Sequence, residues 1–149
     1  MNPYARFAAM IATSTVVMFG LMYLNVYEIG HVYFSQTRLY MALVMGATMA
    51  VIMLAFMQNM YKNRRVNLAI YVSSALVFAL ALWLARSQAT VEDVSWMRAM
   101  IPHHSIAILT SERANISDPR VRELADQIIE SQREEIAEMK ALIEELQNR

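Results

Sequence analysis

Residues 97–104 include two methionines and two adjacent histidines, in a chain that has no cysteine. On an α-helix, Met97, Met100, His103 and His104 would share an arc of roughly 120°, because each residue advances by about 100°. Thioether and imidazole are neutral ligands and the thioether is soft, so this set favours monovalent copper or silver over magnesium, calcium or manganese. The alternative is that the methionines fill a core and the histidines are ordinary polar residues of a helix.

The residues around this cluster predict two helices that fold back on each other. The first would run from a capping box at Thr90 and Asp93 to about residue 114. A break follows, after which Ser117 or Asp118 would cap a second helix with Pro119 in its first turn. This second helix carries an apolar stripe made of Val121, Leu124, Ile128, Ile136, Met139, Ile143 and Leu146.

An antiparallel hairpin of these two helices would add residues to the candidate site. Equal rise along both helices places Met97 near Ile136 and Met139, and the two histidines opposite residues 129–132. Met139 is therefore a fifth candidate ligand, and Gln132 and Glu135 are further ligands or hydrogen-bonding partners. Two helices cannot bury both of their apolar faces against each other, so we expect a homodimer that forms a four-helix bundle.

The chain that precedes the hairpin has the composition of a membrane domain. Hydrophobic residues make up 57% of the sequence, and the mean hydropathy is +0.30. Three apolar runs, at residues 7–24, 39–57 and 66–85, approach the length needed to cross a hydrocarbon core of roughly 30 Å. The sequence thus predicts an all-α protein with two domains, a three-span membrane domain at residues 1–87 and a helical hairpin at residues 88–149.

Charge is distributed unequally between the two halves. Residues 1–90 contain six Lys or Arg and a single acidic residue, Glu28, whereas residues 91–149 contain seven Lys or Arg and twelve Asp or Glu. Lys62, Arg64 and Arg65 crowd the turn between the second and third spans, so the positive-inside rule places this turn and the N-terminus in the cytoplasm and the hairpin outside. The lipid bilayer is then one partner. The acidic half has no basic face for nucleic acid.

Two further groups of residues could have chemical roles. The methionines 41, 45, 49, 53 and 57 form a slowly winding stripe along the second span; it could pass a soft cation along, but packing is the commoner role. Glu28 and His31 have the Glu-x-x-His spacing of di-iron bundles, although one copy is insufficient for such a site. His31 lies in the connection expected on the same side of the membrane as the hairpin, and so could approach it.

The hairpin resembles a bacterial family, the domain of unknown function numbered three hundred and five. The resemblance rests on the Met-Ile-Pro-His-His segment at residues 100–104 and on a Gln-x-x-Glu-Ile-x-x-Met pattern formed by Gln132, Glu135, Ile136 and Met139. The three spans resemble those of membrane-anchored members. The resemblance implies a ferritin-like four-helix arrangement and, because some secreted members bind copper in the periplasm, metal ligation by Met100, His103, His104 and Met139.

The sequence departs from the family pattern at two points. Ser105 stands where a glutamine is common, which leaves one contact near the site in doubt. Secreted members often have two hairpins, each with its own His/Met motif, whereas this chain has one, so its bundle would require dimerisation.

The function expected from these observations is that of a protein anchored in the bacterial inner membrane that binds Cu(I), or Ag(I), outside the cytoplasm for copper tolerance or delivery. A copper-handling protein would be its partner, and we expect no enzymatic activity. The main alternative is a membrane scaffold whose hairpin mediates dimerisation or partner binding. A metal-dependent oxidase is disfavoured because no further residues suggest a substrate pocket.

Overall fold

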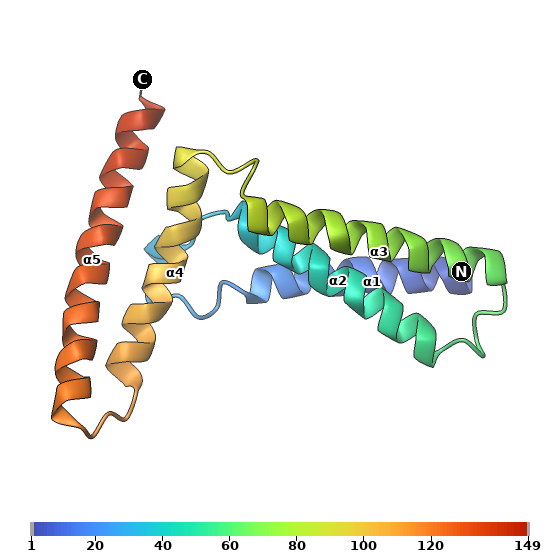
Figure 1. The fold of residues 1–149 in the computed structure, drawn as a ribbon, viewed down its shortest axis with the longest axis horizontal. Coiled ribbons are helices and arrows are strands. Elements are labelled where there is room, and N and C mark those ends of the chain that lie inside the picture. Colours follow the sequence, from blue (N-terminus) through green and yellow to red (C-terminus); the bar gives the residue numbers. More distant parts are fainter. Residues whose placement is uncertain (1, 149) are drawn as a thin grey trace. The chain divides into compact units, whose positions relative to one another are not determined.

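A computed structural model describes residues 2–148 of the chain as an all-α fold. Its five α-helices (Figure 1) are α1 (Pro3–Leu21), α2 (Gln36–Phe56), α3 (Arg64–Ser87), α4 (Asp93–Arg113) and α5 (Pro119–Gln147). A short 3-10 helix, η1 (Ile29–His31), precedes α2, and no β-strand occurs among residues 2–148. The expected fold class is confirmed at this level.

The helices belong to two compact units. Unit 1 comprises Met1–Met22 and Thr37–Thr90, and unit 2 comprises Tyr23–Gln36 and Val91–Arg149. The expected boundary after residue 87 separates the same helices, and the structure adds the connection Tyr23–Gln36 to the unit that contains the hairpin.

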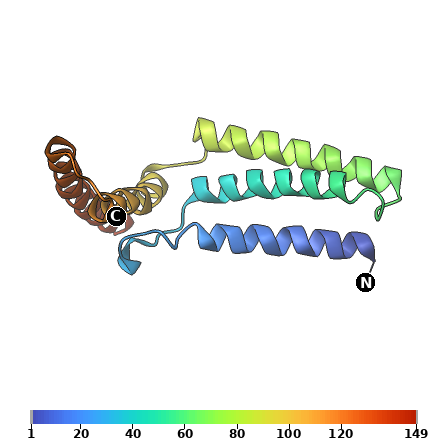
Figure 2. The same cartoon turned by 90° about the horizontal axis from the view of Figure 1, so that it is seen from below.

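Unit 1 contains three helices that are long and apolar enough to span a membrane. They have 19, 21 and 24 residues and begin and end within a few residues of the expected runs. Figure 2 shows them side by side with α2 in the middle, and α2 is accordingly the most buried of the three. Many of their large apolar side chains are exposed, such as Val16 and Leu68, as lipid-facing positions require. These features indicate a membrane location.

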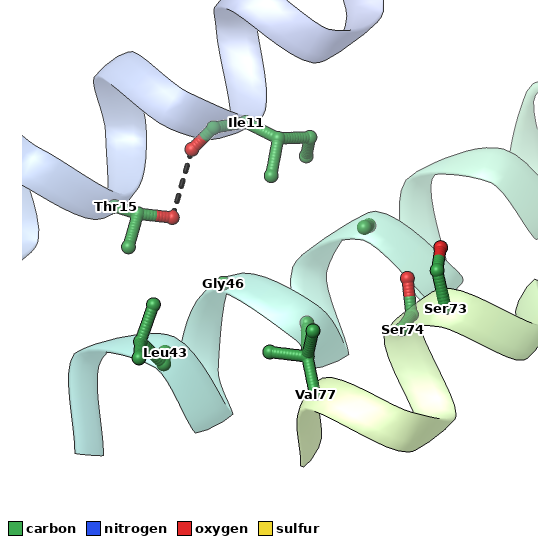
Figure 3. Close-up of a pocket in the computed structure, with 9 residues that line it drawn as sticks. Ile11, Thr15, Leu43, Gly46, Ser73, Ser74 and Val77 are labelled. Carbon is green, nitrogen blue, oxygen red and sulfur yellow. Dashed lines mark hydrogen bonds between the residues drawn. The ribbon is translucent and has the colours of Figure 1, made fainter. Parts of the chain in front are cut away.

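Helix α2 packs through small residues. Ala42, Gly46, Ala47 and Ala50 are all buried, and small side chains of this kind allow membrane helices to approach closely. Gly46 faces Thr15 of α1, whose hydroxyl donates a hydrogen bond to the carbonyl of Ile11 (Figure 3). The methionine stripe of α2 lies beside this packed face, with methionines 45, 49, 53 and 57 half-buried and Met41 exposed.

We expect Gly46→Leu to destabilise unit 1. A Cβ atom added at Gly46 would collide with Thr15 Oγ1, and the β-branched threonine side chain has few alternative rotamers. Overpacking of this kind lowers the free energy of unfolding by about 1–3 kcal/mol. Thermal unfolding of the purified protein in detergent measures the change. The matched control is Gly20→Leu, because nothing lies within 4 Å of a Cβ at Gly20; equal effects of the two variants would contradict the proposed close approach.

The ends of the hairpin helices confirm one capping prediction and correct another. Asp118 caps α5, since its Oδ1 atom accepts a hydrogen bond from the Arg120 amide at 2.9 Å. Thr90, in contrast, does not cap α4, which begins three residues later, after Glu92. The Thr90 hydroxyl lies 2.6 Å from the hydroxyl of Tyr40 instead. The capping pattern did not predict the contact with Tyr40, because Tyr40 is distant from Thr90 in the sequence.

The two hairpin helices pack side by side in antiparallel directions (Figure 1) around one apolar cluster. This cluster, which we call the hairpin core, consists of Met97, Ile101, Ile108, Ile136, Met139 and Ile143. The second half of the predicted apolar stripe of α5 packs in or against the hairpin core, and the first half does not. Near the start of α5, Ala125 is buried, whereas Val121, Leu124 and Ile128 are exposed, at 49%, 55% and 37%. An exposed apolar row therefore remains on α5.

Candidate functional site

Three of the five predicted ligands are methionines in or against the hairpin core. Met97 on α4 and Met139 on α5 are buried, with 5% and 7% of their surfaces exposed. Met100 is half-buried and packs against the same cluster. Met97 shares this cluster with Ile136 and Met139, and it also lines a pocket with Leu142 and Leu146, which lie further along α5. The expected position of Met97 opposite Ile136 and Met139 stays a prediction. Three thioethers share one apolar environment, which suits either core packing or soft-metal ligation.

His104 is buried between α4 and α5, and both of its ring nitrogens are engaged. Nδ1 lies 2.9 Å from the carbonyl oxygen of Met100, and Nε2 lies 2.7 Å from Glu135 Oε2. A carbonyl and a carboxylate are both acceptors, so each of the two ring nitrogens faces a group to which a ring N–H can donate. His104 thus pairs with Glu135, about one turn beyond the stretch of α5 that equal rise had placed opposite it.

Glu135 is held as a carboxylate by two donors. Its Oε1 atom accepts a hydrogen bond from Ser131 Oγ at 2.9 Å, and its Oε2 atom accepts the bond from His104. The hydrogen bonds from Ser131 and then from His104 lower the pKa of the Glu135 carboxyl below its ordinary value. The side chain is 47% exposed, so solvent screens this ion pair and a competing ligand of His104 could displace it.

His103 differs from the other candidate ligands because its side chain is exposed. It lies on α4 between the buried residues Pro102 and His104. Its ring centroid is 6.1 Å from that of His104, with the two planes at 68°. Met97 and Met139 thus belong to the hairpin core and Met100 packs against it. His104 contacts the backbone carbonyl of Met100, and His103 is exposed.

The sequence analysis missed the role of Ser105. This residue is fully buried, and its hydroxyl oxygen accepts a hydrogen bond from the Tyr27 amide at 2.6 Å and lies 2.9 Å from His31 Nδ1. The approach of His31 to the hairpin is confirmed, at a position next to His104 in the sequence of α4. No local signal in the sequence could identify Ser105, because its partners precede it by more than 70 residues.

A second set of polar contacts also holds the connection Tyr23–Gln36 against the hairpin. Glu112 Oε1 on α4 accepts hydrogen bonds from the Tyr27 hydroxyl at 3.1 Å and from Arg133 Nη2 on α5 at 2.8 Å. The Arg133 guanidinium lies 5.8 Å from the centroid of the Tyr27 ring, within the range of a cation–π interaction. Unit 2 is thus a three-part assembly of the connection and both hairpin helices.

We expect acid to destabilise unit 2 through His31. Burial, together with the nearby charge of Lys140, lowers the pKa of His31 below 6.5, and Glu28 only partly opposes this shift. At a pH between the pKa of His31 in the folded protein and its ordinary value of 6.5, the unfolded chain binds more protons than the folded one. The stability that unit 2 gains from a neutral His31 is therefore complete above pH 6.5, and it is lost as the pH falls towards the pKa of the folded protein. In a Trp83→Phe background, fluorescence of Trp96 reports the unfolding of unit 2.

The control for this pH dependence is His31→Gln, which cannot titrate in this range. Its unfolding temperature should change less between pH 7.5 and pH 5.5 than that of the parent protein. Equal changes in the two proteins would assign the pH dependence to other groups.

The acidic and histidine side chains alone do not form a metal site. Within residues 2–148, no three His, Cys, Asp or Glu side chains lie close enough to hold one ion. Glu28 and His31, for example, are 3.8 Å apart and have no third partner of this kind. The methionines of unit 2 among the described residues are Met97, Met100 and Met139, and all three lie in or against the hairpin core.

The fold and the candidate site define the protein as an all-α protein with three helices of membrane-spanning character and a helical hairpin that carries a Met/His cluster. The family model for the domain of unknown function DUF305 matches residues 82–148. An uncharacterized protein of Acanthamoeba polyphaga mimivirus is 31% identical over 153 residues, which cover 100% of this chain and 99% of the viral protein. The chain therefore carries a DUF305 domain at residues 82–148 and is homologous along its length to this viral protein. No solved structure matches the chain.

Proposed function

We propose that the protein is a membrane-anchored soft-metal protein that binds Cu(I), or Ag(I), through its helical hairpin for copper tolerance or delivery. The ligands are Nε2 of His104 and the thioethers of Met97, Met100 and Met139. His103, exposed beside His104, is the histidine by which an ion reaches this group from solvent. We further propose that the hairpin lies outside the cytoplasm of a bacterial cell, because the basic turn between α2 and α3 favours the cytoplasmic side.

The geometry of His104 is the observation that carries this proposal. A histidine ligand of a metal commonly donates its other ring N–H to a carbonyl, which fixes the tautomer and the orientation of the ring. His104 has this arrangement, with Nδ1 directed at the Met100 carbonyl. Nε2 then faces α5, where Met139 and Glu135 are one turn apart. Glu135 Oε2 lies 2.7 Å from Nε2, so a metal ion bound at Nε2 would have to displace this carboxylate.

The proposal implies that metal uptake releases a proton. A metal requires the Nε2 lone pair, and this nitrogen carries a hydrogen while it is paired with Glu135. Cu(I) binding therefore displaces both the proton and the carboxylate, and the affinity should fall as the pH is lowered. The thioethers do not titrate, so acid weakens the site without removing every ligand.

A Cu(I) titration of the full chain in detergent, against a coloured Cu(I) chelator, tests the proposal. We expect the wild-type protein to compete with the chelator, and we expect His104→Asn to bind about tenfold more weakly, a difference of about 1.4 kcal/mol. Thr110→Ala is the control, since its hydroxyl contacts only carbonyls of its own helix. A wild-type protein that takes no Cu(I) from the chelator at neutral pH would disprove the metal function.

A second candidate function is that of a membrane scaffold. It is favoured by the exposed apolar row Val121, Leu124 and Ile128 on α5 and by Trp96 on α4, which is 49% exposed. These side chains could pack against a second hairpin and complete a ferritin-like four-helix bundle in a homodimer. Dimerisation without any affinity for Cu(I) would support the scaffold over the metal protein.

A further inference from the structure

The turn between α2 and α3 lies near the start of α1 at one end of unit 1 (Figures 1 and 2). Two cavities of different chemical character meet at this end, at Tyr61. The first has a volume of about 290 Å³ and is lined mainly by cationic and amide side chains, namely Gln58, Asn59, Lys62, Arg64 and Asn67. The second has a volume of about 450 Å³ and is lined mainly by apolar ones, among them Phe7, Met10, Met57 and Met60. Both cavities also include Tyr61.

The wall shared by the two cavities is held in place by side chains from α1 and α3. Tyr61 is buried, and its ring lies 5.2 Å from that of Tyr4 and 5.3 Å from that of Phe7. The Tyr4 hydroxyl donates to Asn67 Oδ1 at 2.9 Å, and Asn67 Nδ2 donates to the Tyr61 carbonyl at 2.7 Å. These contacts fix the turn against α1, so both cavities exist before any ligand binds.

The cations at this end of unit 1 have no anion to pair with. The segments Met1–Met22 and Thr37–Thr90 contain no Asp or Glu. Lys62 and Arg64 are exposed, as is Arg6 on the wall of the apolar cavity, and none of the three takes part in a salt bridge within residues 2–148. An anion that neutralises them must therefore come from outside the unit.

We propose that this end of unit 1 binds one anionic phospholipid. Its phosphate lies in the polar cavity, where Lys62, Arg64 and the amide side chains supply charge-assisted and neutral hydrogen bonds. One acyl chain lies in the apolar cavity beyond Tyr61. A soluble anion would account for the first cavity only, whereas a lipid accounts for both and is present at the ends of membrane-spanning helices.

Native mass spectrometry of the full chain, released from detergent with equimolar phosphatidylglycerol and phosphatidylcholine of identical acyl chains, tests this proposal. We expect phosphatidylglycerol to be retained preferentially. The double variant Lys62→Gln/Arg64→Gln should lower this preference about tenfold or more, because both cations that attract the anionic headgroup are removed. Both positions are exposed, so thermal unfolding should be unchanged. The matched control is Arg86→Gln, an exposed cation in the last turn of the same helix.

Two further measurements separate the lipid from a simple anion. Met60→Gln places a polar group in the apolar cavity at a position that is 64% exposed, and it should lower lipid retention without altering the charge. Excess inorganic phosphate should not displace the lipid. Displacement by phosphate would indicate an anion site without an acyl groove. Equal retention of the two lipids, or an equal loss with Arg86→Gln, would overturn the proposal.

Discussion

Replacing Met97, Met100 and Met139 together by leucine is expected to weaken Cu(I) binding by about a thousandfold and to leave the hairpin folded. Leucine has nearly the volume of methionine, so each exchange in the hairpin core lowers the free energy of unfolding by less than about 1.5 kcal/mol. Each lost ligand weakens binding by about tenfold, or 1.4 kcal/mol. The measurement is competition with a Cu(I) chelator, accompanied by far-ultraviolet circular dichroism to follow helix content.

Three methionines of α2 provide a matched control, because replacing them also removes three thioether sulfur atoms. Met45, Met49 and Met53 lie half-buried along α2, and their joint replacement by leucine should leave Cu(I) affinity unchanged if that stripe only packs. An unchanged affinity in the hairpin variant would show that its methionines are core residues and nothing more. A loss in the α2 variant alone would transfer the soft-metal role to the membrane helices.

The second large effect is expected from Ser105→Ala, which should detach the connection Tyr23–Gln36 from α4. Ser105 is fully buried, and the alanine leaves the amide of the half-buried Tyr27 without its acceptor and Nδ1 of the buried His31 without its partner. A buried polar group without a hydrogen bond destabilises a protein by about 1–3 kcal/mol. We therefore expect the free energy of unfolding of unit 2 to fall by about 2–4 kcal/mol.

Hydrogen exchange at the Tyr27 amide measures this change at the affected bond. Exchange of this amide should become much faster in Ser105→Ala, whereas it should be unaffected in Thr110→Ala, which removes another hydroxyl from the same helix. If the Tyr27 amide remains equally protected in both variants, the Ser105 hydroxyl does not hold the connection. Equal acceleration in both would indicate a general loosening of α4.

The contrast between Ser105 and the residues beside it explains why the site was only partly predictable. Met97, Met100 and His104 could be grouped from the sequence because a helix brings residues three and four apart onto one face. Glu135 could be included because the hairpin register follows from the rise of each helix. Ser105 offered no such pattern, since the residues that contact it come from the connection between α1 and α2.

By itself, the sequence determined the elements whose causes are local. Apolar runs of sufficient length predicted the three membrane-type helices, and Asp118 followed by Pro119 predicted the start of α5, because hydropathy and capping depend on neighbouring residues. The spacing of methionines and histidines predicted a cluster on one face of α4 for the same reason.

Only the tertiary structure decided how these elements use their side chains. It placed Thr90 beside Tyr40, which moved the start of α4 to Asp93. It buried Ala125 and exposed Leu124 on α5, paired both nitrogens of His104 and left His103 at the surface. These outcomes depend on which faces meet and on hydrogen bonds between residues 31 to 78 positions apart, and contacts over such distances are selected by packing and by the satisfaction of buried polar groups, which no local pattern encodes.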